Sequence, residues 1–294
     1  MILQPECVGC IFNQVLKAFR LLKPDIERET IVHAQKKVME YLIPLDFDEI
    51  SAPIVGGFTY SLVAELLDLH DPYKELKQKY NDLALRYYDE VKEVIQNTAD
   101  PLFEALAAAA LGNTVDFASQ HKIDLVKDIK EFSPDNLKIN DYAQFQKSLK
   151  NYSQILILGD NCGEIVFDKL LVETLQELYP DLEIIYAVRS KPIINDSTIE
   201  DAQYIGLTDL VKVIEISPVP GVDLSRATEE FKKYFYSEEN FILSKGQGNF
   251  ECLYGMEVPN KEIFYLLKAK CPLMERIFGV PVGSLIFKEK TKNF

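Results

Sequence analysis

The sequence contains no tryptophan and only three histidines among its 294 residues. The histidines, His33, His70 and His121, are scattered, and no serine or cysteine lies in a nucleophile-elbow context. The sequence therefore supports no Ser-His-Asp or Cys-His triad. Basic residues are also few, 32 against 46 acidic residues, and the net charge is −14. No long Lys/Arg cluster interrupts this acidic background, so a nucleic-acid partner is not expected, because phosphate backbones would be repelled.

Long apolar runs are missing as well. The longest, residues 102–111, is interrupted by Glu104. It falls short of the ~20 apolar residues that a membrane span needs, so no membrane partner is expected. The number of cysteines is odd, which argues against a disulfide framework and suits a reducing compartment. The N-terminus shows no signal-peptide pattern, and we therefore expect a cytoplasmic protein. The cysteines are Cys7, Cys10, Cys162, Cys252 and Cys271.

Residues 1–150 are predicted to form an all-helical domain. The stretch 10–22 places apolar residues at three- and four-residue spacing, as an amphipathic helix requires. Segments 26–42, 60–69 and 73–96 are also predicted to be helical. Asp100 and Pro101 provide an N-cap and a first-turn proline for a further helix that ends near Gly112. No strand is expected before residue 150.

Residues 151–294 show a different pattern, in which short apolar runs alternate with helical segments. Alternating strands and helices indicate parallel βαβ units, so we predict an α/β fold with an open, doubly wound, mostly parallel sheet. In such sheets ligands bind beyond the carboxyl ends of the strands. The predicted strands are 153–159, 183–188, 211–216 and 241–244, with further ones at 262–269 and 284–288; the predicted helices are 164–179, 198–205 and 225–236.

Polar side chains follow three of these strands. Asp160, Asn161 and Asp196 offer hard oxygen donors, which suit Mg²⁺ or Mn²⁺. Lys245 offers a positive charge to a phosphate, and the glycines after it let backbone N–H groups approach phosphate oxygens. Arg189 could add a fork-shaped clamp. The three loops share one edge of the predicted sheet, and this co-location favours a metal and phosphate site.

Each loop also has an ordinary structural explanation. An Asp-Asn pair after a strand is often a turn or a helix cap, and residues 195–198 could simply cap the next helix. Gly-Gln-Gly at 246–248 resembles many short turns. The pattern Gly-x-Gly-x-x-Gly is absent, so a dinucleotide fingerprint is not supported.

The pair Cys7-x-x-Cys10 has two interpretations. Two thiolates at this spacing could form half of a zinc site, but structural zinc generally takes four ligands and no second pair has ligand spacing. A redox CxxC usually follows a strand, and none precedes this pair. We favour a structural pair at the start of the first helix; metal binding stays open.

These motifs together resemble the damage-control phosphatase family, also known as domain of unknown function 89. The resemblance spans nearly the whole chain, and the paired N-terminal cysteines are similar to those of the mainly prokaryotic subgroup. Cys162 stands where a small residue such as alanine is usual. The segments that carry the resemblance are 5–10 with Gln14, 71–73, Gly112-Asn113-x-x-Asp116, 159–164, 195–198, 220–221 and 245–251.

The resemblance implies a helical N-terminal domain, 1–150, on a Rossmann-like domain, 151–294, that carries a metal-dependent phosphatase site. It implies that Asp160, Asn161 and Asp196 are the metal ligands and that Lys245 holds the phosphate. The implied metals are Mn²⁺, Ni²⁺, Co²⁺ or Mg²⁺. The implied substrates are small phosphorylated metabolites, including sugar phosphates and damaged or surplus intermediates. Further residues implied at the site are Glu164, Asn195, Gly246, Gln247, Gly248, Asn249 and, from the helical domain, Asn113 and Asp116.

The hypothesis is phosphomonoester hydrolysis in a cleft between the two domains. A water oriented by the metal is the favoured nucleophile, and an aspartyl-phosphate through Asp160 is the alternative. Two other classes stay open. One is an S-adenosylmethionine-dependent carboxyl methyltransferase, although the first loop, 159–163, is better suited to cations. The other is a non-catalytic module that binds a metal or a sugar phosphate. The sequence leaves the oligomeric state open.

Overall fold

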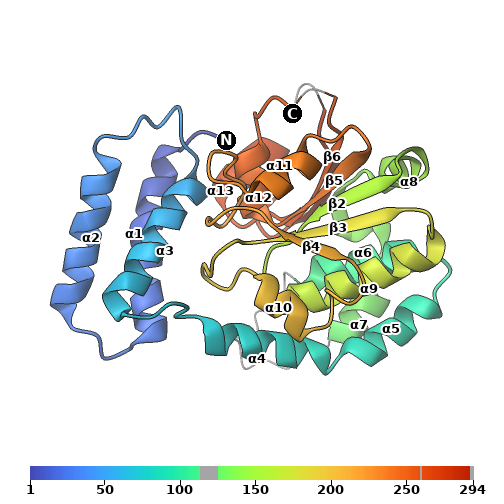
Figure 1. Ribbon diagram of the computed structural model, residues 1–294, viewed down its shortest axis with the longest axis horizontal. Coiled ribbons are helices and arrows are strands. Elements are labelled where there is room, and N and C mark those ends of the chain that lie inside the picture. The colour runs from blue at the N-terminus through green and yellow to red at the C-terminus, as the bar shows by residue number, and fades with distance from the viewer. Residues whose placement is uncertain (113–124, 259, 292–294) are drawn as a thin grey trace.

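The computed structural model describes residues 1–112, 125–258 and 260–291 (Figure 1). It contains a seven-stranded sheet with helices on both faces. Among the described residues no helix is both long and apolar enough to cross a membrane. The helices are α1 (Pro5–Leu22), α2 (Arg28–Leu42), α3 (Ala52–Leu67), α4 (Lys74–Leu85), α5 (Tyr88–Gln96), α6 (Pro101–Gly112), α7 (Leu125–Lys130), α8 (Tyr142–Asn151), α9 (Glu164–Leu178), α10 (Ile199–Tyr204), α11 (Glu229–Phe235), α12 (Gln247–Leu253) and α13 (Pro272–Phe278), with a 3₁₀ turn at Pro134–Asn136. The strands are β1 (Leu137–Asn140), β2 (Gln154–Leu158), β3 (Glu183–Val188), β4 (Lys212–Glu215), β5 (Asn240–Lys245), β6 (Ile263–Lys268) and β7 (Leu285–Glu289).

The sheet has the strand order β1-β7-β6-β5-β2-β3-β4. Strands β4, β3, β2, β5 and β6 are parallel neighbours, whereas β7 runs antiparallel to β6 and parallel to β1. The predicted α/β fold with a mostly parallel sheet is thus confirmed. Strands β5, β2 and β3 lie side by side, so the polar loops that follow them open at one edge of the sheet.

Both faces of the central strands are buried. In β2, Ile155 and Ile157 pack toward one layer of helices, and Leu156 and Leu158 pack toward the other. Helices α5–α10 contribute to the first layer and α11–α13 to the second (Figure 1). This two-sided burial explains why these strands are short, almost continuous apolar runs in the sequence.

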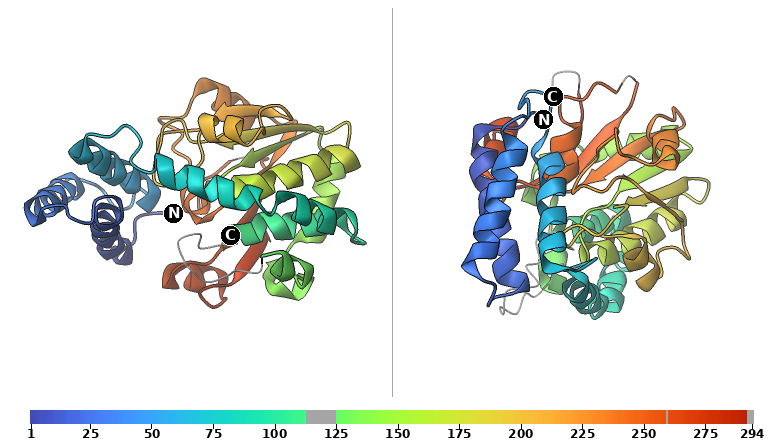
Figure 2. Two further views of the ribbon diagram at one scale, coloured as in Figure 1. Left: turned by 90° about the horizontal axis from the view of Figure 1, so that it is seen from below. Right: turned by 60° about the vertical axis from the view of Figure 1, so that its left-hand side comes forward.

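Helices α1–α3 form a bundle with a core of their own, and the bundle projects from the side of the sheet (Figures 1 and 2). The later helices of the N-terminal half, α5–α8, share the core of the sheet instead. The cores therefore divide between α3 and α4, because Ala84 of α4 already lies in the core of the sheet, whereas the change of sequence pattern lies near residue 150.

Three local expectations were wrong. Strand β1 precedes residue 150; it has only four residues at the sheet edge and an alternating burial pattern, so it lacks the long apolar run of the central strands. The helix expected over 73–96 is interrupted near Tyr87, which separates α4 from α5. Helices α12 and α13 were not predicted, because each has only seven residues and shows little periodicity.

Candidate active site

The loops after β2 and β3 are joined by backbone contacts that bring the three predicted metal ligands together. Asn161 and Asp196 form an isolated antiparallel bridge. The N–H of Ser197 donates to the carbonyl oxygen of Asp160 at 2.9 Å, and the N–H of Cys162 donates to the carbonyl oxygen of Asn195 at 2.8 Å. The carboxylates of Asp160 and Asp196 therefore lie on adjoining turns at the carboxyl edge of the sheet.

A buried guanidinium links the two carboxylates. Arg189 Nε donates to Asp196 Oδ2 at 2.6 Å, and its Nη2 donates to Asp160 Oδ1 at 3.4 Å. Its Nη1 donates to Asn249 Oδ1 at 2.8 Å and to the carbonyl oxygen of Gly221 at 3.0 Å. The Arg189 side chain is completely buried. The sequence led us to expect the Arg189 guanidinium as a phosphate clamp. In the structure its hydrogen-bond donors contact protein groups instead, and it links the turns from the buried side of the site.

Lys245 is also turned inward. Its Nζ donates to Asp168 Oδ1 at 2.5 Å and to the carbonyl oxygen of Ala109 at 3.1 Å, and it lies 2.5 Å from Glu164 Oε1 as an ion pair. Tyr186 Oη donates to the other Asp168 oxygen at 2.7 Å. The expected contact between Lys245 and a phosphate stays a prediction; in this structure the ammonium is paired with two buried carboxylates. The physical reason is that an ammonium group held away from water needs opposite charge close to it.

Asp168 and Tyr186 were not among the predicted site residues. Asp168 lies one helical turn after Glu164 on α9, and this four-residue spacing was the signal in the sequence that could have paired the two carboxylates. Burial raises the pKa values of both Glu164 and Asp168, and the positive Lys245 opposes the shift.

Gly246 stands against the Asp160 carboxylate. Its φ is 78°, and a Cβ built there would lie 2.0 Å from Asp160 Oδ2. Only glycine fits both the conformation and the space. Asn249 ties this loop to the first turn, because its Nδ2 donates to the carbonyl oxygens of Gly159 and Lys245 at 3.1 and 2.8 Å.

The remaining predicted residues lie farther from the two carboxylates or outside the described part of the chain. Gln247 Nε2 donates to Glu251 Oε1 at 2.6 Å. Gly248 packs against the backbone of Pro220, where a Cβ would lie 2.1 Å from the carbonyl oxygen. Asn113 and Asp116 lie outside the described residues.

The donor set at the two turns fits a hard divalent cation. Asp160 and Asp196 supply carboxylate oxygens, and Asn161, whose Nδ2 donates to Asp160 Oδ2 at 2.8 Å, supplies an amide. Burial raises the pKa of Asp196; the positive Arg189 opposes this shift and the negative Asp160 adds to it. Among the described residues no three His, Cys, Asp or Glu side chains are grouped as metal ligands.

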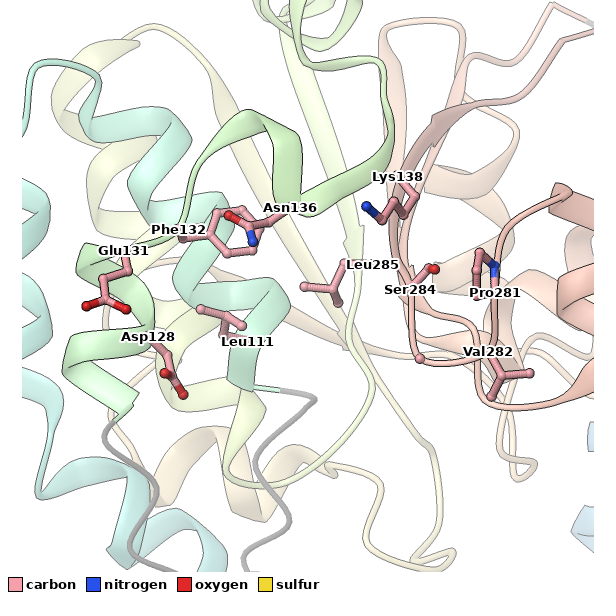
Figure 3. Close-up of a pocket in the computed structure, with 11 residues that line it drawn as sticks. Leu111, Asp128, Glu131, Phe132, Asn136, Lys138, Pro281, Val282, Ser284 and Leu285 are labelled. Carbon is pink, nitrogen blue, oxygen red and sulfur yellow. The ribbon is translucent and has the colours of Figure 1, made fainter.

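A cavity of about 600 Å³ lies between α7 and the loop before β7 (Figure 3). Asp128, Phe132, Lys138 and Ser284 are among its lining residues. It includes none of the predicted site residues.

A family model described as the damage-control phosphatase ARMT1-like domain matches residues 3–286. The chain belongs to the damage-control phosphatase family. The resemblance seen in the sequence is thus confirmed; its finer assignment to the subgroup with the N-terminal cysteine pair stays a prediction.

Archaeal relatives match this chain over almost its full length. It is 34% identical to a damage-control phosphatase from Pyrococcus horikoshii, over 97% of each chain. It is 30% identical to a damage-control phosphatase from Archaeoglobus fulgidus, over 98% of this chain and 99% of the relative. The crystal structure of a DUF89 family protein from Pyrococcus horikoshii matches with a TM-score of 0.87 and 29% identity, covering 99% of this chain and 100% of that one. These relatives support a phosphatase role.

Gly246→Ala should disable the phosphatase. The new methyl group would collide with Asp160 Oδ2, so we expect kcat/KM for p-nitrophenyl phosphate to fall by about 100-fold or more, the size of effect seen when one stabilising group is misplaced. Gly255→Ala is the matched control, because Gly255 has a similar φ, 76°, but nothing within 4 Å of the added Cβ. Equal losses in the two variants would show that backbone strain, not the contact with Asp160, matters.

Lys245→Met should destabilise the fold in a pH-dependent way. Without the ammonium, the pKa values of Glu164 and Asp168 rise further, so above the ordinary carboxyl pKa the folded state binds more protons than the unfolded state. Stability of the variant then falls as pH rises. We expect a loss of about 3–5 kcal/mol near pH 8 and a smaller loss near pH 5, measured by urea unfolding.

Lys212→Met is the control for this variant, since Lys212 forms an ion pair with Glu230 at 2.6 Å but is about half exposed. Its stability should change little at either pH. A loss in Lys245→Met that is equal at pH 5 and pH 8 would contradict the proposed charge balance.

Proposed function

We propose that this protein is a divalent-metal-dependent phosphatase that hydrolyses phosphomonoesters of small metabolites, such as sugar phosphates or damaged and surplus phosphorylated intermediates. The observation that carries the proposal is the juxtaposition of Asp160, Asn161 and Asp196 on two bridged turns in a member of the damage-control phosphatase family. The partner is a small phosphorylated molecule.

Asp160, Asn161 and Asp196 would hold the cation, which on this proposal is Mn²⁺, Ni²⁺, Co²⁺ or Mg²⁺. When bound, it would supply Lewis acidity at a phosphoryl oxygen and favour ionisation of a nearby water. Asp160 and Asp196 lie on adjoining buried turns, where each negative charge destabilises the other. A bound divalent cation would stabilise the ionised form of both carboxylates, which supports a cation of this class. Arg189 already reduces the repulsion between them from behind.

The surrounding residues would shape the substrate pocket and place positive charge near the phosphate. Gly246 removes steric bulk beside Asp160, and the loop from Gly246 to Asn249 would shape the phosphate pocket. Glu164 and Asp168 fix the ammonium group of Lys245 in a buried position. From there its positive charge would stabilise negative charge on a bound phosphate electrostatically, without direct contact. Both Asp160 oxygens already have hydrogen-bonding partners, Arg189 and Asn161, which makes Asp160 a poor nucleophile and favours attack by water.

Asp160→Ala should abolish metal-dependent release of phosphate. Loss of one carboxylate removes a proposed ligand and leaves Asp196 as the carboxylate partner of Arg189. We expect kcat/KM to fall by at least about 1000-fold with each metal in a panel of Mn²⁺, Ni²⁺, Co²⁺ and Mg²⁺, with p-nitrophenyl phosphate as substrate.

Asp209→Ala, which removes an exposed carboxylate, is the control and should keep wild-type activity. Turnover by Asp160→Ala at saturating metal would discard this site. Wild-type turnover that survives exhaustive chelation would discard the metal dependence.

A further inference from the structure

Helix α4 carries two buried polar side chains on one face, and neither belongs to the proposed metal site. Lys77 and Asn81 are four residues apart, and their exposed fractions are 3% and 0%. The helix follows the segment 71–73, Asp-Pro-Tyr, which is part of the family resemblance and for which the proposed function has no role. Long polar side chains are rarely buried this completely without specific partners.

Asn81 contacts the turn that holds Asp160 and Asn161. Its Oδ1 accepts a hydrogen bond from the N–H of Gly163 at 2.7 Å. Gly163 has a φ of 82° and is the N-cap of helix α9, two residues after Asn161. Asn81 Nδ2 is buried and has no hydrogen-bond partner in the described part of the chain. A side chain kept at that cost is better explained by its contact with the turn than by packing.

Lys77 contacts the other turn through a relay. Its Nζ lies 2.8 Å from Asp71 Oδ2 and donates to Asp201 Oδ2 at 3.0 Å. The same Asp201 oxygen accepts from the Thr198 N–H at 2.9 Å and from Thr198 Oγ1 at 2.7 Å. Thr198 caps α10 and lies two residues after Asp196. The segment 71–73 thus supplies an anchor for Lys77, and Lys77 in turn braces the Asp196 turn.

We propose that Lys77 and Asn81 are positioning residues that hold the Asp160–Asn161 turn and the Asp196 turn at the separation a divalent cation requires. One helix reaches both turns: it contacts Gly163 directly and Thr198 through Asp201, and each of these two residues lies two positions after a proposed ligand. Movement of either turn relative to α4 would break a buried polar contact, which is costly. This inference rests on the proposed function, because it assigns a role toward the same cation.

The test measures cation affinity and turn protection separately. In Asn81→Ala and Lys77→Met we expect the Kd for Mn²⁺, determined by calorimetry without substrate, to rise about tenfold, the effect of losing an outer contact to a ligand. Amide hydrogen exchange of the metal-free proteins should quicken at 160–165 in Asn81→Ala and at 196–202 in Lys77→Met.

Three further variants separate positioning from general destabilisation. Asn81→Asp keeps an acceptor for Gly163 and Lys77→Arg keeps the positive charge, so both should bind Mn²⁺ within about threefold of wild type. Lys79→Met, on the exposed face of the same helix, should match wild type in both assays. Urea unfolding reports whether each variant remains folded. If a truncated variant does not fold, its conservative counterpart still tests the role: a folded Asn81→Asp or Lys77→Arg that binds Mn²⁺ about tenfold more weakly contradicts it.

The proposed function and the positioning role fail in different ways. If wild-type protein binds no Mn²⁺, the proposed function fails, and the inference fails with it. If wild-type protein binds Mn²⁺ and the Kd of both truncated variants lies within about twofold of the wild-type Kd, only the positioning role is overturned. Unchanged exchange at both turns overturns it too.

Discussion

The site depends on one interaction, the buried contact of the Arg189 guanidinium with the carboxylates of Asp160 and Asp196. Two carboxylates on adjoining buried turns repel each other, and the repulsion is strong where water is excluded. Arg189 follows strand β3 directly and reaches both. Through Asn249 it also reaches the loop after β5. Three separate turns are thereby joined by one side chain, which contacts both carboxylates.

A second group of the same kind lies beneath the first. Lys245 faces Glu164 and Asp168, again one positive side chain between two carboxylates, and Tyr186 closes the group with a hydrogen bond to Asp168. Buried groups of this kind stabilise little in total, but removing one partner leaves an expensive uncompensated charge. The Lys245 group therefore resists rearrangement. This rigidity suits the neighbouring Arg189 group, in which two carboxylates are held together.

The helices of the N-terminal half differ in their relation to the candidate site. Helices α1–α3 form their own core beside the sheet, whereas α4 reaches the turns that carry the proposed ligands. The two halves of the sequence are therefore joined by contacts between residues about 80 and 120 positions apart, such as Asn81 with Gly163 and Lys77 with Asp201.

The meeting of the three polar loops at one edge of the sheet could be predicted from the sequence, because the signals for it are local. Strands β2, β3 and β5 are short apolar runs, each followed at once by polar residues, and parallel strands bring those residues to one edge. The contacts of Arg189 and Lys245 could not be predicted from the sequence, because these contacts depend on which strands are neighbours in the sheet. One clue was present: Leu243 and Lys245 share a face of β5 by two-residue alternation, and Leu243 packs into the helical layer that contains α6 and α9.

The most direct test of the proposed cation site is anomalous diffraction from crystals soaked in Mn²⁺, recorded near the manganese absorption edge. We predict a strong peak within bonding distance of oxygens from Asp160, Asn161 and Asp196, with Arg189 still in contact with Asp196. Absence of a peak there at saturating Mn²⁺, or a peak only beside Cys7 and Cys10, would contradict the proposal.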